Sequence, residues 1–303
     1  MDDEAFRALV FVLDLQAGSP AIRRIRAWTM DRLAPQPGEI AIDIGSGTGE
    51  DVQLFADLVG ETGRAVGVEP SSRMRALAES RAGEAGSRAT FMDADAHELP
   101  FADSSVDVVR SERVFQHLDD PERAAAEIAR ILRPGGRVAI IDSDWGSAIM
   151  HPGDPDVVRR LQVFMWGDWA NPFSGRRLPR LLTAAGLSVD PDIGSQATIL
   201  PQQVAGAAPM IEQSTAGAVA EGAISADERA SDSARRPRPG RPGGLGVRVG
   251  DTLLGGGRPT RNGLSGWCVE PDCAASPGVA GGVLSRTARL RRRSPSIIVG
   301  DGP

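Results

Sequence analysis

Three closely spaced glycines, Gly45, Gly47 and Gly49, follow the most strand-like run of the sequence, IAIDI at residues 40–44. Glycine tolerates positive φ and leaves the backbone bare, so a ligand can lie directly against such a loop. The N–H groups that open a following helix would favour a phosphate. However, the spacing G-S-G-T-G is not the dinucleotide pattern G-x-G-x-x-G, and no Lys-Ser/Thr follows as in a P-loop. A pyrophosphate ligand is therefore disfavoured.

Carboxylates near this loop indicate a different kind of ligand. Asp43 precedes the loop, Glu69 ends the run VGVE, and Asp95 stands in DADAHELPF after a third apolar run. A carboxylate at the tip of the second strand is placed to accept hydrogen bonds from two ribose hydroxyls. Asp95 could accept a hydrogen bond from an exocyclic amine. Together these groups suit a cationic adenosine compound, a sulfonium or an amine.

The elements that must position these groups are strands alternating with helices. Apolar runs predict strands at 40–44, 64–69, 89–95, 106–111 and 137–142. Helical patterns between them predict helices at 49–60, 71–83 and 120–132, the last with Asp120 as N-cap and Pro121 as its first residue. This alternation is typical of a parallel sheet with crossover helices. The prediction is an α/β, doubly wound, mostly parallel sheet.

Further elements flank this centre. Residues 1–33 are expected to form helices that pack in front of the sheet. The pattern at 175–187 predicts another amphipathic helix, and 188–200 predicts a sixth strand. We expect this domain to extend over residues 1–230.

Five stretches resemble, in order, the motifs of class I S-adenosylmethionine-dependent methyltransferases: DIGSGTG, VGVEPS, DADAHELPF, VDVVRSERVFQHLDDP and ILRPGGRVAIID. The resemblance is closest to the branch that includes ubiquinone/menaquinone and natural-product small-molecule methyltransferases, and it covers roughly residues 20 to 200. It implies a Rossmann-like methyltransferase fold and S-adenosyl-L-methionine as cofactor. It also implies methyl transfer to a small-molecule acceptor, in secondary metabolism or quinone-type biosynthesis.

The same resemblance implies the cofactor contacts. Carried over position by position, they fall on Asp43, Gly45, Gly47, Glu69, Asp95, Ala96 and Ser111. The two glycines would pass the methionine part, and Glu69 would hold the ribose. Asp95 and the backbone of Ala96 would read adenine, while Ser111 would border the methionine end.

Candidate catalytic residues follow the fourth and fifth predicted strands. Positioning alone can supply about 7–11 kcal/mol for a displacement on an activated methyl group. A base is needed only if the acceptor must lose a proton. His117 is the candidate base, or alternatively it orders its loop; Asp142 and Asp144 could steer or deprotonate the acceptor. Aromatic side chains that either pack or shape a site for a flat substrate are Trp145, Trp166 and Trp169.

Composition limits the remaining function classes. The 303 residues include two cysteines, Cys268 and Cys273, which excludes a disulfide framework and a thiolate metal site and favours the reducing cytoplasm. No window of about 18 uncharged apolar residues occurs, so we expect no membrane span. All 34 basic residues are arginine, and residues 1–230 carry a net charge of −13, which disfavours nucleic acid as a partner.

The last 73 residues, 231–303, differ in composition. They hold 12 Arg against five acidic residues and are rich in Pro and Gly without periodicity, which predicts a tail with little regular structure. The resembling branch closes its sheet with a seventh, antiparallel strand, and a reading-frame shift near residue 231 or a flexible extension would each explain its absence. The sheet edge is then unpaired unless 246–249 or 294–300 substitutes.

Two other function classes stay open. One is a protein of this fold with a non-methylating or regulatory role, and the other is a macromolecule methyltransferase that uses its basic tail for capture. Turnover of pooled metabolites compared with RNA would separate these classes. The sequence indicates neither the acceptor atom nor the oligomeric state.

Overall fold

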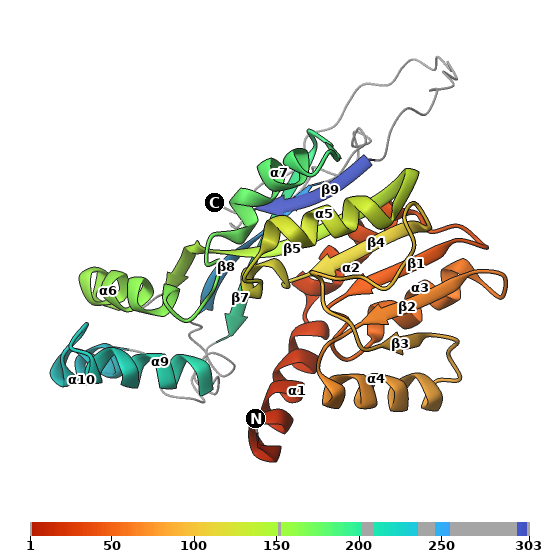
Figure 1. Cartoon of the computed structure of the whole chain (residues 1–303). Helices are drawn as coiled ribbons and strands as arrows, with labels where there is room; N and C mark the ends of the chain where they lie inside the picture. The colour runs from red at the N-terminus through yellow and green to blue at the C-terminus, as the bar shows by residue number, and fades with distance from the viewer. Residues whose placement is uncertain (1, 151–152, 202–208, 236–245, 255–295, 302–303) are drawn as a thin grey trace, which may run out of the picture.

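The computed structural model describes residues 2–150, 153–201, 209–235, 246–254 and 296–301 (Figure 1). Its centre is a parallel sheet of five strands in the order β3-β2-β1-β4-β5. Their bounds are β1 Ile40–Ile44, β2 Arg64–Val68, β3 Thr90–Met92, β4 Val106–Glu112 and β5 Leu132–Met150. The strand order reverses at β1, which pairs in parallel with both β2 and β4. The predicted α/β architecture with a doubly wound, mostly parallel sheet is confirmed.

Alternating strand residues build a core on each face of this sheet. On one face Ile42, Val109 and Ile140 pack against α5 (Pro121–Ile131) and α7 (Ser174–Ala184). On the other face their strand neighbours pack against the end of α2 (Pro20–Leu33) and against α3 (Glu50–Val59). Successive side chains of a strand point to opposite faces of the sheet. Because helices cover both faces here, nearly every residue of these strands must be apolar.

Most helix boundaries follow the sequence signals. In α5, the Asp120 side chain accepts a hydrogen bond from the Arg123 N–H at 2.9 Å, and Pro121 opens the helix. Gly60 ends α3 at a φ of +69°. The other helices are α1 Asp3–Ala17, α4 Ser72–Glu84, η1 Phe115–His117, α6 Pro155–Trp166, α9 Pro209–Ala220 and α10 Ala226–Arg235.

Helices α1 and α2 lie N-terminal to the sheet, as expected. No single helix of the described residues is long and apolar enough to cross a membrane, and α1 and α2 reach that length only as a pair bent by 70°. Helix α2 buries Ile22, Ile25 and Leu33 against the sheet.

The predicted sixth strand is two strands, β6 (Ser188–Val189) and β7 (Ile193–Pro201). Proline cannot donate to a ladder, so Pro191 interrupts the pairing. The Asp192 N–H donates to the Asp190 side chain at 2.8 Å, which turns the chain between the two strands. The expectation of one continuous strand over 188–200 is therefore wrong in this detail.

Two segments of the tail complete the far edge of the sheet. Strand β9 (Ser296–Asp301) runs parallel to Arg137–Ile141 of β5. Strand β8 (Gly246–Leu254) runs antiparallel to the later part of β5 and pairs on its other side with β7. Strand β8 includes residues 246–249, and β9 overlaps residues 294–300, which are the two segments named as substitutes for the seventh strand. Tail residues 236–245, 255–295 and 302–303 lie outside the described residues.

Candidate active site

A cavity of about 920 Å³ lies beyond the carboxyl ends of β1, β2 and β4, where open α/β sheets bind ligands. Small-molecule sites typically measure about 300–1,000 Å³, so this one is large. Its walls are the glycine loop, the tips of β2 and β4, the segment around η1, one side of α1, and residues of β5 and α6. One end is lined by charged groups and the other by aromatic and apolar ones.

The glycine loop follows β1 with three residues in the left-handed region. The φ angles of Gly45, Gly47 and Gly49 are +71°, +50° and +83°. A Cβ on Gly45 would collide with the side chain of Val114, and one on Gly49 would lie 2.7 Å from the ring of Phe91. Around Gly47, no atom of the described residues lies within 4 Å of such a Cβ. Gly45 and Gly49 are therefore required by packing, whereas Gly47 lines the cavity and has open space where a Cβ would lie.

Glu69 joins the tip of β2 to this loop. Its Oε2 accepts a hydrogen bond from the Gly47 N–H at 3.0 Å, and its Oε1 accepts one from the Ser71 N–H at 2.9 Å. Glu69 is 9% exposed and lines the cavity. A carboxylate oxygen can accept more than one hydrogen bond, so both oxygens keep lone pairs for ligand hydroxyls.

Asp95 lies further along the same wall. It lines the cavity, and its carboxylate accepts a hydrogen bond from the His97 N–H at 2.7 Å and contacts the His97 ring. Burial alone would raise the pKa of Asp95, but the hydrogen bonds from His97 outweigh it and hold that pKa below the usual range. The neighbouring Ala96 is buried. Asp95 is therefore a charged acceptor at neutral pH.

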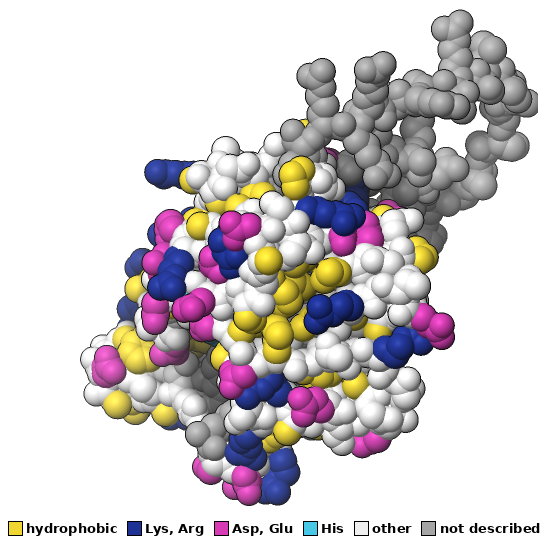
Figure 2. Space-filling view, turned by 45° about the vertical axis from the view of Figure 1, so that its right-hand side comes forward, with side chains coloured by type: hydrophobic (Ala, Val, Ile, Leu, Met, Phe, Trp, Pro, Cys, Tyr) yellow, Lys and Arg dark blue, Asp and Glu magenta, His cyan; other side chains and the backbone are white. Residues whose placement is uncertain are grey.

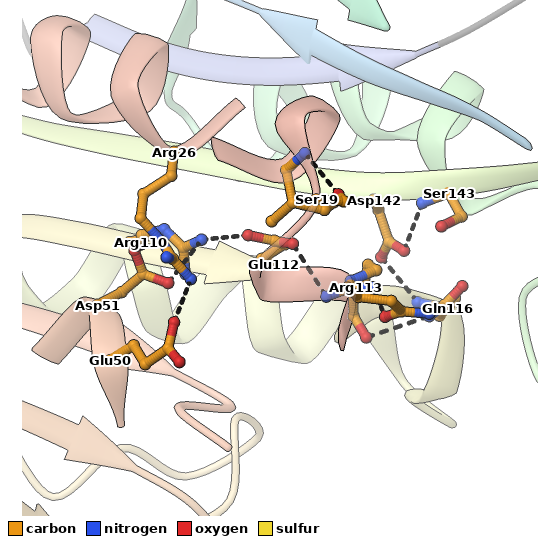
Figure 3. A network of polar contacts seen from close by, with 12 residues as sticks. Ser19, Arg26, Glu50, Asp51, Arg110, Glu112, Arg113, Gln116, Asp142 and Ser143 are labelled. Atoms are coloured by element: carbon orange, nitrogen blue, oxygen red, sulfur yellow. Dashed lines mark hydrogen bonds and ion pairs between the residues drawn. The ribbon is translucent and has the colours of Figure 1, made fainter. Parts of the chain in front are cut away.

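A buried arginine lies at the centre of the charged end (Figure 3). Arg110 of β4 stands opposite Asp43 of β1 in the parallel register, and its Nη1 lies 3.0 Å from the Asp43 Oδ1. It also contacts Glu112 and lies 3.2 Å from Asp51 of α3, which pairs in turn with Arg26 at 2.7 Å. The Arg110 side chain is only 3% exposed.

This cluster changes the titration of Asp43. Burial raises the pKa of Asp43 to about 7, and the charges of Asp51 and Glu112 act in the same direction, while Arg110 opposes them. The sequence analysis overlooked Arg110, although an arginine inside the apolar run 106–111 was a signal that a buried partner must exist.

Carboxyl groups outnumber guanidinium groups around the cavity. Among the residues that the structure describes, six acidic side chains line it, against three arginines. The acidic ones are Asp43, Glu50, Asp51, Glu69, Asp95 and Glu112, and the basic ones are Arg26, Arg110 and Arg113. Such a balance attracts a cation, because charge within a low-dielectric cleft is weakly screened.

Ser111 is fully buried and is not among the residues that line the cavity. Its neighbours Arg110 and Glu112 do line it, since alternate strand residues share a face. At the tip of β4 the cavity is therefore lined by Glu112 and not by Ser111.

Aromatic side chains form the opposite end of the cavity. Trp145 stacks on Trp169 with ring centroids 4.6 Å apart, and the His117 ring lies 5.0 Å from Trp169 in a tilted arrangement. Trp166 lines the same end, and its indole N–H donates to the Trp145 carbonyl at 3.2 Å. Met150, Met165 and the apolar side of α1, with Leu9, Val12 and Leu13, complete it. This end suits a flat, apolar molecule.

His117 is the candidate catalytic residue that reaches the cavity. Burial lowers the pKa of His117, and the positive charge of Arg113 lowers it further. The imidazole is therefore neutral at physiological pH.

Asp142 and Asp144 do not line the cavity. Asp142 is fully buried, and its Oδ2 accepts hydrogen bonds from the Gln116 N–H at 2.8 Å and from the Ser174 hydroxyl at 3.1 Å. Asp144 forms a bidentate ion pair with Arg176 at 2.5 and 2.8 Å. These contacts anchor η1 and α7 to the end of β5, so the placement of both carboxylates differs from the acceptor-steering position expected from the sequence.

Charge on the outer surface is mixed. On the face that Figure 2 shows, arginine side chains alternate with acidic ones over the described residues, and apolar side chains gather near the middle. A nucleic-acid surface concentrates arginine and lysine on one face.

Comparison with known proteins places this arrangement in a known group. Residues 42–140 match the family model described as "Methyltransferase domain". The chain is 33% identical over 218 residues to an uncharacterized 37.1 kDa protein of a Streptomyces fradiae transposon, covering 72% of this chain and 63% of that one. It is 28% identical over 132 residues to a ubiquinone/menaquinone biosynthesis C-methyltransferase of Vibrio vulnificus, covering 43% of this chain and 50% of that enzyme.

The fold has a close parallel among solved structures. The crystal structure of a putative methyltransferase from Bacillus halodurans superimposes with a TM-score of 0.55 at 16% sequence identity, covering 76% of this chain and 96% of that one. The chain thus shares the fold of that protein over about three quarters of its own length, whereas it spans less than two thirds of the length of the two sequence relatives.

Proposed function

We propose that this chain, whose residues 42–140 match a methyltransferase domain, is a class I S-adenosylmethionine-dependent methyltransferase that transfers a methyl group to a small, flat, largely apolar acceptor. The observation that carries the proposal is the two-ended cavity. Its charged end has an excess of carboxyl groups beside an open glycine, and its other end is a wall of tryptophans.

The charged end fits the cofactor on three counts. The space beside Gly47 accepts a ligand against bare backbone. Glu69, already fixed by two backbone N–H groups, would accept from the ribose hydroxyls, and Asp95 from the adenine amine. The excess of negative charge favours a ligand that carries a sulfonium and an ammonium group. When bound, S-adenosylmethionine supplies a methyl group on a positively charged, activated sulfur.

The chain's own residues would then act by orientation and by exclusion of water. Trp145, Trp169 and Met165 would hold the acceptor on the apolar side, facing the charged end. Fixing two reactants in near-attack geometry can supply about 7–11 kcal/mol. The acceptor atom bonds to the methyl carbon, the carbon–sulfur bond breaks, and its electron pair remains on sulfur. Buried Asp142 and Asp144 would contribute by holding η1 and α7 in place.

The acceptor class rests on the apolar end alone. A hydroxyaromatic or quinol-type compound fits stacked indoles, and one sequence relative is described as an enzyme of ubiquinone/menaquinone biosynthesis. We propose secondary metabolism as the alternative to quinone-type biosynthesis, since acceptors of this kind also occur there. We also infer a cytoplasmic location from the scarcity of cysteine.

The test combines binding with turnover. Calorimetry with S-adenosylmethionine and S-adenosylhomocysteine should show binding, and transfer of a labelled methyl group should be seen with a panel of hydroxyaromatics and quinols. Amines and total RNA serve as competing panels. Labelling of RNA alone would establish the macromolecule alternative. Cofactor binding without transfer to any panel would favour the regulatory role, and absence of binding would overturn the proposal.

A further inference from the structure

Gln116 lies between two groups that fix the orientation of its amide. Its Oε1 accepts a hydrogen bond from the Trp145 indole N–H at 2.8 Å, and its Nε2 donates to the Arg113 carbonyl at 3.2 Å. An indole N–H can only donate and a backbone carbonyl can only accept. Both contacts would be lost if the amide were turned over, so the hydrogen-bond network assigns oxygen and nitrogen without ambiguity. Gln116 is 4% exposed, and water therefore does not replace these partners.

The second hydrogen of this amide faces His117. Gln116 Nε2 lies 3.2 Å from His117 Nε2. Since the amide nitrogen is a donor, the ring nitrogen opposite must accept, and an imidazole nitrogen that accepts carries no proton. The proton of the neutral ring is then on Nδ1. Among the described residues Nδ1 has no hydrogen-bond partner, and His117 lines the cavity.

We propose that Gln116 is a positioning residue that holds His117 as the neutral imidazole protonated on Nδ1, so that His117 presents a hydrogen-bond donor, and not a base, to the acceptor. Trp145 takes part by fixing the amide. The lone pair that a base would use is occupied by the Gln116 amide. The nearby charge of Arg113 and partial burial, which both lower the pKa of His117, keep the ring in this neutral form.

This inference rests on the proposed function where it concerns the acceptor. A donor at this position favours an acceptor with an oxygen lone pair beside the apolar wall, such as a phenolate or an enolate. The acceptor would give up its proton to water before the reaction. The acceptor atom then forms its bond to the methyl carbon, the carbon–sulfur electron pair goes to sulfur, and no proton passes to His117. The N–H of His117 and the charge of Arg113 would stabilise the oxygen anion.

Nitrogen NMR of the protein labelled at histidine tests the proton position directly. The His117 signals, assigned by loss in His117→Gln, should place Nε2 at the unprotonated shift and Nδ1 at the protonated shift at neutral pH. The measurement is made on the full chain alone and with S-adenosylhomocysteine. A ring protonated on Nε2, or an even mixture of both forms, would overturn the proposal.

Two substitutions of Gln116 sharpen the result. Gln116→Glu replaces the donor by a carboxylate that accepts from both sides, so His117 should switch to the Nε2-protonated form and its pKa should rise. Gln116→Met keeps the length but removes both functions, so both forms should be populated. Gln53→Glu makes the same chemical change on α3, outside the cavity wall, and should leave the His117 signals unchanged. An unaltered proton position in both Gln116 variants would count against the assigned role.

The proposed function and the positioning role of Gln116 can be disproved separately. A wild-type protein that transfers no methyl group but shows the Nδ1-protonated ring contradicts the proposed function and leaves the positioning role intact. A protein that transfers methyl groups but shows the Nε2-protonated ring contradicts the positioning role alone.

Discussion

The guanidinium of Arg110 lies 3.0 Å from the carboxylate of Asp43, and both side chains are only 3% exposed, so the ion pair is buried. The two residues stand opposite each other on β4 and β1, and Asp51 and Glu112 share the same cation. One buried arginine thus compensates several carboxylates next to the glycine loop. The stability of the fold and the charge offered to the cofactor depend on the same group.

Replacing Arg110 by methionine should destabilise the protein by about 3–5 kcal/mol, because it leaves buried carboxylates without a counter-charge. The loss should be smaller at pH 5 than at pH 8, since Asp43 can take up a proton. Urea unfolding at the two pH values measures this. Arg64→Met, which removes an exposed arginine at the start of β2, is the control. Equal losses at both pH values would contradict the coupling.

Cofactor affinity should increase as the pH rises through 7. The pKa of Asp43 in the folded protein is about 7, against 3.8 for the ordinary carboxyl group. Below pH 7 the protonated form predominates, and the cavity loses one negative charge that attracts a cation. Above pH 7 the charge is present, at the cost of fold stability, because between the unfolded pKa of 3.8 and the folded pKa of about 7 the folded state binds a proton that the unfolded state has lost, and stability falls as the pH rises through this range. Calorimetry from pH 6 to 8 should show this dependence in the wild type and its loss in Asp43→Asn.

Glu69→Ala should weaken S-adenosylmethionine binding roughly 10- to 100-fold, because it removes a charged acceptor contributing about 1.5–3 kcal/mol. The matched control is Glu79→Ala on the exposed side of α4. Calorimetry of the two variants isolates the ribose contact. Unchanged affinity in Glu69→Ala would refute the ribose assignment.

Gly47→Val should abolish measurable cofactor binding, because the side chain would fill the open space at this position of the cavity wall. Backbone strain at φ +50° will also lower stability. Gly86→Val provides a matched comparison, since Gly86 has a φ of +64° and equally open surroundings after α4. If both variants lose similar stability but only Gly86→Val still binds the cofactor, the loss of binding in Gly47→Val is due to obstruction of the site and not to backbone strain. Normal binding by Gly47→Val would mean that the loop is only structural.

Asp144→Asn should lower stability more than it lowers turnover per folded molecule. The carboxylate is 2% exposed and pairs with Arg176, and it does not line the cavity. Denaturation midpoints and kinetics of purified folded protein give the two quantities. A large fall in kcat with unchanged stability would restore the acceptor-steering role.

The central sheet was predictable because its signals are local. Apolar runs, the N-cap Asp120 and the glycine loop each depend on a few consecutive residues, and together they predicted the five parallel strands and the helices between them. The Arg110 cluster was not predictable in the same way, since the β1–β4 register decides which carboxylate faces the arginine. One local signal was overlooked. Asp154 followed by Pro155 marks the start of α6, a helix that the sequence analysis did not predict.

The roles of Asp142 and Asp144 required knowledge of distant partners. Both residues stand at the end of the fifth predicted strand, and the sequence offered them as groups that could steer or deprotonate the acceptor. Ser174 and Arg176, which bind them, come some thirty residues later in α7. Nothing in the short stretch IIDSDWG indicates these partners, and only the packing of α7 against β5 reveals them.

The pairing of β5 with β8 and β9 has a consequence for synthesis of the chain. Both partners come from the last part of the sequence, so β5 leaves the ribosome long before either can dock. Until then the nascent sheet exposes one edge to other chains, and contacts of such large sequence separation form slowly. Strands β1, β2 and β4, which carry the charged end of the cavity, can therefore assemble early, while the margin at β5 waits for segments that come much later in the chain.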